Sequence, residues 1–152
     1  NQNAIPIVNY NDPLSNEETR RMEIAALREE RTGVVECVDN DETAAVVASL
    51  VGARRLVILT STNGIYRDVH DPSTLIREIA GASVQEMEAK IDEAMAFCKG
   101  ASRVGANGAK AKLLYAKQAI ENGTEVYIAH AKYPLDAILA ENAPSTRLYL
   151  QK

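Results

Sequence analysis

The sequence predicts an α/β fold, a three-layer αβα sandwich whose sheet is mainly parallel with a mixed edge. Short apolar runs alternate along the chain with longer segments of helical periodicity, the order expected of strands joined by helices. The apolar residues are mostly Val, Ile, Leu and Ala, with one Phe and no Trp. Such side chains suit a sheet that helices bury on both faces.

The first part of the chain predicts two strands and two helices. Residues 5–9 and 34–38 are short apolar runs, typical of buried strands. Residues 16–30 carry a thin apolar stripe among Glu and Arg, which indicates an exposed helix that Gly33 would end. Residues 42–50 have helical spacing, and the Asp and Asn residues just before them are good N-caps.

The middle of the chain contains the clearest strand, over residues 55–60, a continuous apolar run between polar residues. Residues 61–73 are predicted as a loop, because Asn-Gly and Asp-Pro pairs are turn signals. Residues 75–79 are a candidate short strand. A Ser-x-x-Glu capping box then opens a helix over residues 83–98.

The last part continues the alternation. A loop of small residues over 99–107 leads into a helix over 108–122, which the following glycine would end. A strand over 124–129, a short helix over 134–140 with proline near its first turn, and a strand over 146–150 follow.

Composition narrows the class of protein. The 152 residues suit one domain, and the net charge of −4 without a Lys/Arg cluster argues against nucleic-acid binding. The longest apolar run is too short to span a membrane. Cys37 and Cys98 form neither a disulfide framework nor a metal motif, and His70 and His130 lack partners at metal-ligand spacing. We therefore expect a cytoplasmic protein in which side chains do not form a metal site of their own.

Polar clusters follow three predicted strands, where ligands gather in open α/β sheets. They comprise residues 9–12, 39–41 and 60–64. A glycine-containing segment, residues 105–112, then opens a helix whose N-terminus and lysines could face an anion. Each cluster also has a plainer interpretation as a turn, an N-cap, a loop or solvated lysines.

The order of these clusters resembles the glutamate 5-kinases, a branch of the amino-acid kinase family with a carbamate kinase-like fold. "IPIVNYND" is similar to their first substrate segment, and "VDNDETAAVVASLVGARRLVILTSTNGIY" to the segment that joins the substrate and nucleotide sites. "GANGAKAKLLYAKQAIENGTEVYIAHA" is similar to their ATP loop with its helix and strand, and "PSTRLYL" to their closing strand. The resemblance runs over nearly the whole chain, in order.

The resemblance implies a role for each matching residue. Asp12 and Asn40 would hold the substrate, L-glutamate, while Asp41 and Lys112 would act in catalysis. ATP with Mg²⁺ would be the phosphoryl donor, and a homo-oligomer is expected. The nucleotide-binding residues would be Thr60, Ser61, Gly64, Tyr66, Ala106, Asn107, Gly108, Lys110 and Lys112.

Departures from the family pattern keep other functions open. Ser61 replaces an aspartate, Tyr10 replaces a glutamate, and the ATP loop lacks a glycine and a threonine. The glycine-rich segments that begin family members have no counterpart, so residues 1–152 are expected to be the C-terminal, ATP-binding part of the kinase domain. The alternatives are a uridylate kinase-like or acetylglutamate kinase-like enzyme, and a non-catalytic nucleotide-binding module.

Overall fold

The computed structural model of the protein describes residues 40–98 and 108–151. The chain divides into two compact units, residues 1–43 and 44–152. Helix α2 (Asn40–Leu50) begins in the first unit and ends in the second. The helix starts earlier than the sequence predicted, so Asn40 and Asp41 form its first turn instead of preceding it as caps.

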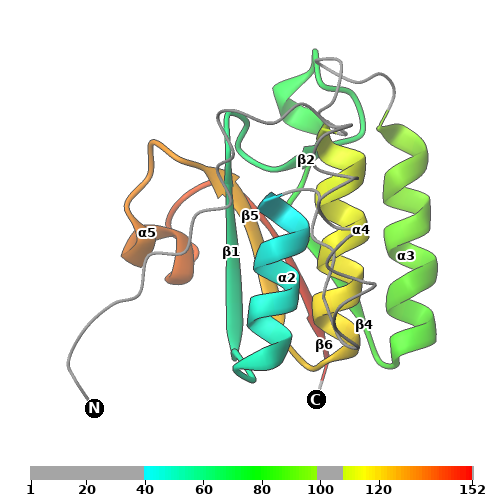
Figure 1. Cartoon of the computed structure of the whole chain (residues 1–152). Coiled ribbons are helices and arrows are strands. Elements are labelled where there is room, and N and C mark those ends of the chain that lie inside the picture. The colour runs from blue at the N-terminus through cyan, green and yellow to red at the C-terminus, as the bar shows by residue number, and fades with distance from the viewer. Residues whose placement is uncertain (1–39, 99–107, 152) are drawn as a thin grey trace, which may run out of the picture. The chain divides into compact units, whose positions relative to one another are not determined.

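A four-stranded sheet forms the centre of the second unit (Figure 1). In spatial order its strands are β1 (Arg55–Thr60), β5 (Glu125–His130), β6 (Ser145–Leu150) and β4 (Glu78–Gly81). β1 and β5 are parallel, as are β4 and β6, whereas β5 and β6 are antiparallel. The predicted α/β class is confirmed. Among the described strands, however, the antiparallel pair lies between the two inner strands and not at an edge.

The connection between β5 and β6 explains this antiparallel pair. It carries only the five-residue helix α5 (Leu135–Leu139), which is about 7.5 Å long at about 1.5 Å per residue. A six-residue strand such as β5 is about 20 Å long. Because α5 is too short to cross back along the sheet, the chain re-enters from the end at which it left.

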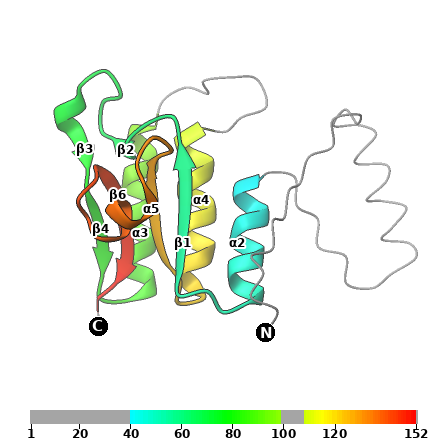
Figure 2. The ribbon, with the colours of Figure 1, turned by 90° about the vertical axis from the view of Figure 1, so that its left-hand side faces the viewer.

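Helices cover both faces of the sheet (Figure 1, Figure 2). α3 (Val84–Phe97) and α4 (Gly108–Glu121) pack against one face, and α5 packs against the other. The core on the α3–α4 side includes Ile58, Met87, Ile91, Leu113, Ile120, Val126, Ile128 and Leu148. A smaller cluster lies under α5 and contains Tyr127, Ala129, Ile138 and Ala143.

The predicted capping box of α3 is present. Ser83 Oγ accepts a hydrogen bond from Glu86 N at 3.2 Å, and Glu86 Oε2 accepts one from Ala82 N at 3.0 Å. The glutamate thus reaches one residue further back than in the usual box. Hydrogen bonds from Lys90 and from Ala82 N lower the pKa of Glu86.

The segment between β1 and α3 differs from the prediction. Residues 61–73, predicted as a loop, contain the strand β2 (Ile65–Tyr66). β2 pairs with β3 (Leu75–Ile76) in a separate two-stranded antiparallel sheet, and the 3₁₀ turn η1 (Pro72–Thr74) lies just before β3. The predicted strand over 75–79 is therefore two strands, β3 and β4, in different sheets. Local sequence cannot distinguish these strands, because their separation depends on which neighbour each one meets.

A charged network occupies the open part of the α5 face. Arg55 and Arg147 both donate to Glu125, as does Tyr127 Oη. Burial opposes ionisation of Glu125, but these hydrogen bonds outweigh it and hold its pKa below the usual value. Arg147 also pairs with Glu141 at 2.7 Å. In residues 40–98 and 108–151, no helix has both the length and the apolar character needed to cross a membrane.

Candidate functional site

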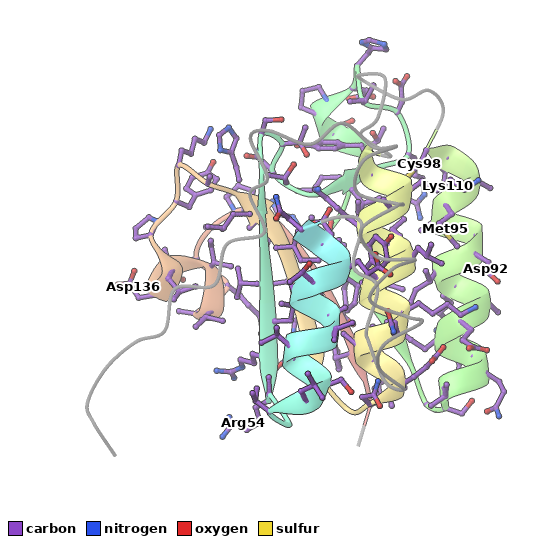
Figure 3. All side chains as sticks on the ribbon, in the orientation of Figure 1. Arg54, Asp92, Met95, Cys98, Lys110 and Asp136 are labelled. Carbon is purple, nitrogen blue, oxygen red and sulfur yellow. The ribbon has the colours of Figure 1, made fainter. Side chains whose placement is uncertain are left out.

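The carboxyl ends of β1 and β5 lie at one edge of the sheet. Thr60 and His130 are register partners at the ends of these strands, and Ala131 N donates to Thr60 O at 2.9 Å. α4 begins at the same edge, because it runs opposite to β5 across a short turn. Lys110 lies at that end of the unit, whereas Arg54 lies at the opposite end (Figure 3). This is the edge at which an open α/β sheet binds ligands.

Thr146 of β6 fixes the segment that follows β1. Its Oγ1 accepts a hydrogen bond from Ile65 N at 2.8 Å and donates one to Ile76 O at 2.6 Å. Thr146 is fully buried, and Gly64, with φ +152°, packs directly against it. Thr62 Oγ1 donates to Gly64 O at 3.1 Å. The segment from Ser61 to Tyr66 is therefore anchored to the sheet.

A hollow of about 250 Å³ lies beside this segment. We call it the strand-end hollow. Its wall has an apolar part from Tyr66, Val69 and Pro72, and a polar part that includes two basic side chains from the end of β5. The complete lining is Ser61, Thr62, Asn63, Tyr66, Val69, Pro72, His130 and Lys132. The volume is close to the lower limit for small-molecule pockets, about 300 Å³.

The structure brings two of the predicted nucleotide-binding residues, Ser61 and Tyr66, into this hollow. Thr60 ends β1 immediately before Ser61, and Gly64 is buried against Thr146, so neither residue lines the hollow. Lys132 and His130, which the sequence analysis did not select, contribute the basic part of its wall.

The beginning of α4 is a second part of the candidate site. Gly108 has φ +56° and starts a 14-residue helix without an acidic residue in its first turn. The N–H groups of the first turn leave partial positive charge at this end. Lys110 is exposed and Lys112 is half-buried. None of these three residues lines the strand-end hollow. The arrangement suits a ligand whose anionic end lies near the start of α4 and whose uncharged end lies away from it, in the strand-end hollow.

Cys98 lies near this helix start, at the end of α3. Burial raises the pKa of its thiol, although the positive charge of Lys110 opposes the shift. The thiol also donates a hydrogen bond to Ala94 O, with Sγ and O 3.5 Å apart. These contacts indicate a structural cysteine and not a nucleophile.

The structure does not test the roles of the remaining predicted residues. Asp12, Ala106 and Asn107 lie outside the described residues, and so does Cys37. Asn40 and Asp41 belong to the first unit. The convergence of Asn40 with Thr60 and Lys112 therefore stays a prediction.

Sequence reasoning did not select His130 or Lys132, and it included Asn63 only as a member of the polar cluster over residues 60–64. A signal for His130 and Lys132 was present, because a polar pair follows the predicted strand over 124–129 just as polar residues follow the other strands. The Asn63-Gly64 pair was recognised as a turn signal, but Asn63 was not selected as a binding residue. Its Oδ1 is the buried side-chain oxygen without a hydrogen-bond partner in the described part of the chain.

A larger hollow of about 340 Å³ runs along β4 and α3. None of the predicted site residues lines it, and Lys90 Nζ reaches across to Ala80 O at 2.6 Å. We therefore assign the candidate site to the smaller hollow at the strand ends. Within residues 40–98 and 108–151, no three His, Cys, Asp or Glu side chains are grouped to hold a metal ion.

Comparisons with known proteins identify the family of this chain. The profile of the amino acid kinase family matches residues 1–130, and the chain belongs to that family. Glutamate 5-kinase from Hydrogenovibrio crunogenus (strain DSM 25203 / XCL-2) is 34% identical over 129 residues, which cover 85% of this chain and 29% of that protein. Glutamate 5-kinase from Shouchella clausii (strain KSM-K16) is 35% identical over 130 residues, with the same two coverages of 85% and 29%.

Two further proteins share part of this similarity. Acetylglutamate kinase from Arthrobacter sp. (strain FB24) is 41% identical over 64 residues, covering 42% of this chain and 21% of that protein. The chain thus spans less than a third of each of these three relatives. The crystal structure of UMP kinase from Ureaplasma parvum aligns with 92% of this chain and 55% of its own at 14% identity, with a TM-score of 0.47. That likeness is too distant to bear on the fold or the function.

Proposed function

We propose that this chain forms the ATP-binding part of a kinase that phosphorylates the side-chain carboxylate of L-glutamate. The product would be glutamyl 5-phosphate, the first intermediate of proline biosynthesis. The observation that carries the proposal is the extent of similarity. The alignment with glutamate 5-kinase covers 85% of this chain, whereas the alignment with acetylglutamate kinase covers 42% of it.

The proposed reaction makes limited chemical demands on the protein. A carboxylate is already ionised near neutral pH, so the acceptor needs no general base. Catalysis then rests on positioning the reactants and on stabilising charge at the transferred phosphoryl group. Lys112 and the N-terminus of α4 would supply positive charge, and Lys110 would add to it. Mg²⁺, held mainly by the phosphates, would supply further charge when bound.

The residues of the first unit would hold the acceptor. Asp12 and Asn40 would bind L-glutamate, and Asp41 would orient the lysines around the transferred group. These roles come from the family pattern. Thr60 and Ser61 would contact the nucleotide from the end of β1, beside the strand-end hollow.

The test uses the full-length protein with MgATP and, separately, L-glutamate, N-acetyl-L-glutamate or UMP. ADP release is measured together with hydroxamate formation in hydroxylamine, which displaces phosphate from an acyl phosphate. We expect L-glutamate to give the fastest ADP release and a hydroxamate. If UMP were the one acceptor that stimulated ADP release, and no hydroxamate formed, carboxylate phosphorylation would be refuted.

Paired lysine variants test the role of α4. Lys112→Gln should reduce kcat by about 100-fold, the effect of removing one donor from a developing charge. Lys117→Gln on the same helix is the control, because Lys117 pairs with Glu88 and Asp92 of α3, at 3.7 and 3.8 Å. Equal losses in the two variants would remove Lys112 from the proposed mechanism.

A second candidate, phosphorylation of N-acetyl-L-glutamate, has one observation in its favour. The match to acetylglutamate kinase is shorter but has higher identity, 41% over 64 residues. Both candidates yield a hydroxamate, so the relative rates with the two acceptors distinguish them. A protein that binds nucleotide but releases no ADP with any of the acceptors would instead be a non-catalytic module.

A further inference from the structure

β4 leaves one row of its backbone groups without a strand partner. It ends the four-stranded sheet, with β6 on one side and no described strand on the other (Figure 2). Gly81 O accepts a hydrogen bond from Gln151 N, next to the end of β6, at 2.8 Å. Because the backbone groups of successive residues point to alternate sides of a strand, Glu78 and Ala80 direct their N–H and C=O groups away from β6. An open row of this kind is a template for another strand.

Lys90 of α3 places a positive charge at one end of this row. Its Nζ donates to Ala80 O at 2.6 Å, as expected if that carbonyl faces away from β6, and pairs with Glu86 Oε1 at 2.7 Å. A carbonyl oxygen has two lone pairs, so Ala80 O can also accept a hydrogen bond from an added strand.

Glu78 places a negative charge at the other end of the row. Its side chain is exposed, and its Oε1 accepts a hydrogen bond from Tyr149 Oη at 3.0 Å. Tyr149 carries no positive charge, so the carboxylate of Glu78 is oriented without being neutralised. The open side of β4 therefore runs from a carboxylate at Glu78 to an ammonium group at Ala80.

This order of charges is complementary to itself when the strand is reversed. In an antiparallel pair centred on Ile79, Glu78 of one copy lies opposite Ala80 of the other, and the two residues exchange two hydrogen bonds. The symmetry repeats this at the other end, as in any two-fold interface. We propose that β4 joins two copies of this chain by antiparallel pairing, with Lys90 of each copy beside Glu78 of the other.

The larger hollow adds side-chain surface to the same interface. It lies along β4 and has a volume of about 340 Å³, and its wall includes Lys90, Glu93, Ala94 and Phe97 of α3. Residues at this spacing form one stripe along a helix. The Phe97 ring is 37% exposed. A second copy of the strand would bring its own α3 stripe to this hollow and cover apolar surface that β4 alone leaves open.

The test measures self-association of the full-length protein by sedimentation velocity over a range of concentrations, without nucleotide or acceptor. Glu78→Lys sets two lysines against each other at both ends of the strand pair, and Lys90→Glu sets two glutamates there. Each variant should weaken association about 10-fold or more, because two contacts between opposite charges become contacts between like charges. Lys117→Glu is the control, since Lys117 does not line the hollow and should leave association unchanged.

A mixture of the Glu78→Lys and Lys90→Glu proteins gives the sharpest result. In the mixed pair the introduced lysine meets the introduced glutamate, and the native Glu78 meets the native Lys90. Mixing should therefore restore association that neither variant has alone. A folding defect in either protein would not be repaired in this way, and circular dichroism confirms that each one is folded.

Hydrogen exchange measured by mass spectrometry locates the contact. The peptide that contains β4 should exchange more slowly in wild type than in Glu78→Lys at the same concentration, because pairing protects the amides of Glu78 and Ala80. A wild type that stays monomeric would overturn the inference, and so would single variants that associate like wild type or a mixture no better than either variant. Equal exchange of β4 in the two proteins would also overturn it. Each of these failures leaves the proposed function untouched, since no step of the assay involves the kinase reaction.

Discussion

Gly64 is the position at which a single methyl group should most disturb the candidate site. Its φ of +152° lies outside the regions that L-residues favour. A Cβ built there would lie 2.5 Å from Thr146 Oγ1 and 2.8 Å from Thr146 N. The second atom is backbone in β6, which cannot move without disturbing the β5–β6 ladder. Gly64→Ala must therefore displace either the strand or the segment that carries Ser61 and Tyr66.

The magnitude follows from two contributions. Forcing an extra methyl into a packed site costs about 1–3 kcal/mol, and an unfavourable backbone conformation for alanine adds about 1 kcal/mol or more. Displacing Thr146 also weakens the hydrogen bonds to Ile65 N and Ile76 O. We expect Gly64→Ala to lower the free energy of unfolding by about 2–4 kcal/mol and to weaken ADP binding.

Gly52→Ala is a matched control. Gly52 also has positive φ, +60°, but nothing lies within 4 Å of a Cβ built there. Its substitution should cost only the backbone contribution, about 1 kcal/mol, and leave ADP binding unchanged. Urea denaturation monitored by circular dichroism gives both free energies, and calorimetry gives both affinities. Equal destabilisation by the two substitutions would refute the proposed packing of Gly64 against Thr146.

Three further predictions concern the fold around the site. The lowered pKa of Glu125 means that its ionised form contributes stability above the ordinary pKa of 4.5, and that this contribution is lost as the pH falls through the folded-state value. In urea denaturation between pH 7 and pH 3, the free energy of unfolding should therefore fall more for wild type than for Glu125→Gln. Identical pH profiles for the two proteins would contradict this stabilising role of Glu125. Ser83→Ala should lower the free energy of unfolding by about 1 kcal/mol through loss of the N-cap bond, and a change under a few tenths would count against the cap. In a Cys37→Ser background, Cys98 should react with iodoacetamide more slowly at pH 8 than a free thiol does, because burial raises its pKa; faster reaction would show that the thiol is exposed.

Much of the secondary structure was predictable because the signals are local. The apolar run of β1, the Ser83 capping box and the glycine after α4 each act within a few residues of the element they define. The approximate extent of both long helices followed from these signals. The early start of α2 was missed because Asn and Asp are compatible with both a cap and a first turn.

The candidate site was predictable only in part. Thr60 and Ser61 were predicted because polar residues directly follow an obvious strand, and Lys112 was predicted from the ordered motifs of the family; their roles stay predictions, although Ser61 does line the hollow. His130 was not selected, since its place in the lining of the hollow depends on neighbours far away in sequence, and Asn63 was named only within the polar cluster over residues 60–64. His130 reaches the hollow because β5 pairs with β1 in parallel, and neither strand encodes that pairing by itself.

The sequence alone determined the α/β class, the positions of most elements within residues 40–98 and 108–151, and membership of a kinase family, because periodicity, capping and ordered motifs are properties of neighbouring residues. Tertiary structure decided that β5 and β6 run antiparallel, that residues 75–79 divide between two sheets, and that Thr146 anchors the segment after β1. The β5–β6 pairing joins residues 16 to 22 positions apart, and the bonds of Thr146 with Ile76 and with Ile65 join residues 70 and 81 positions apart. Contacts at such separation form only once the chain has folded, so no local pattern could specify them.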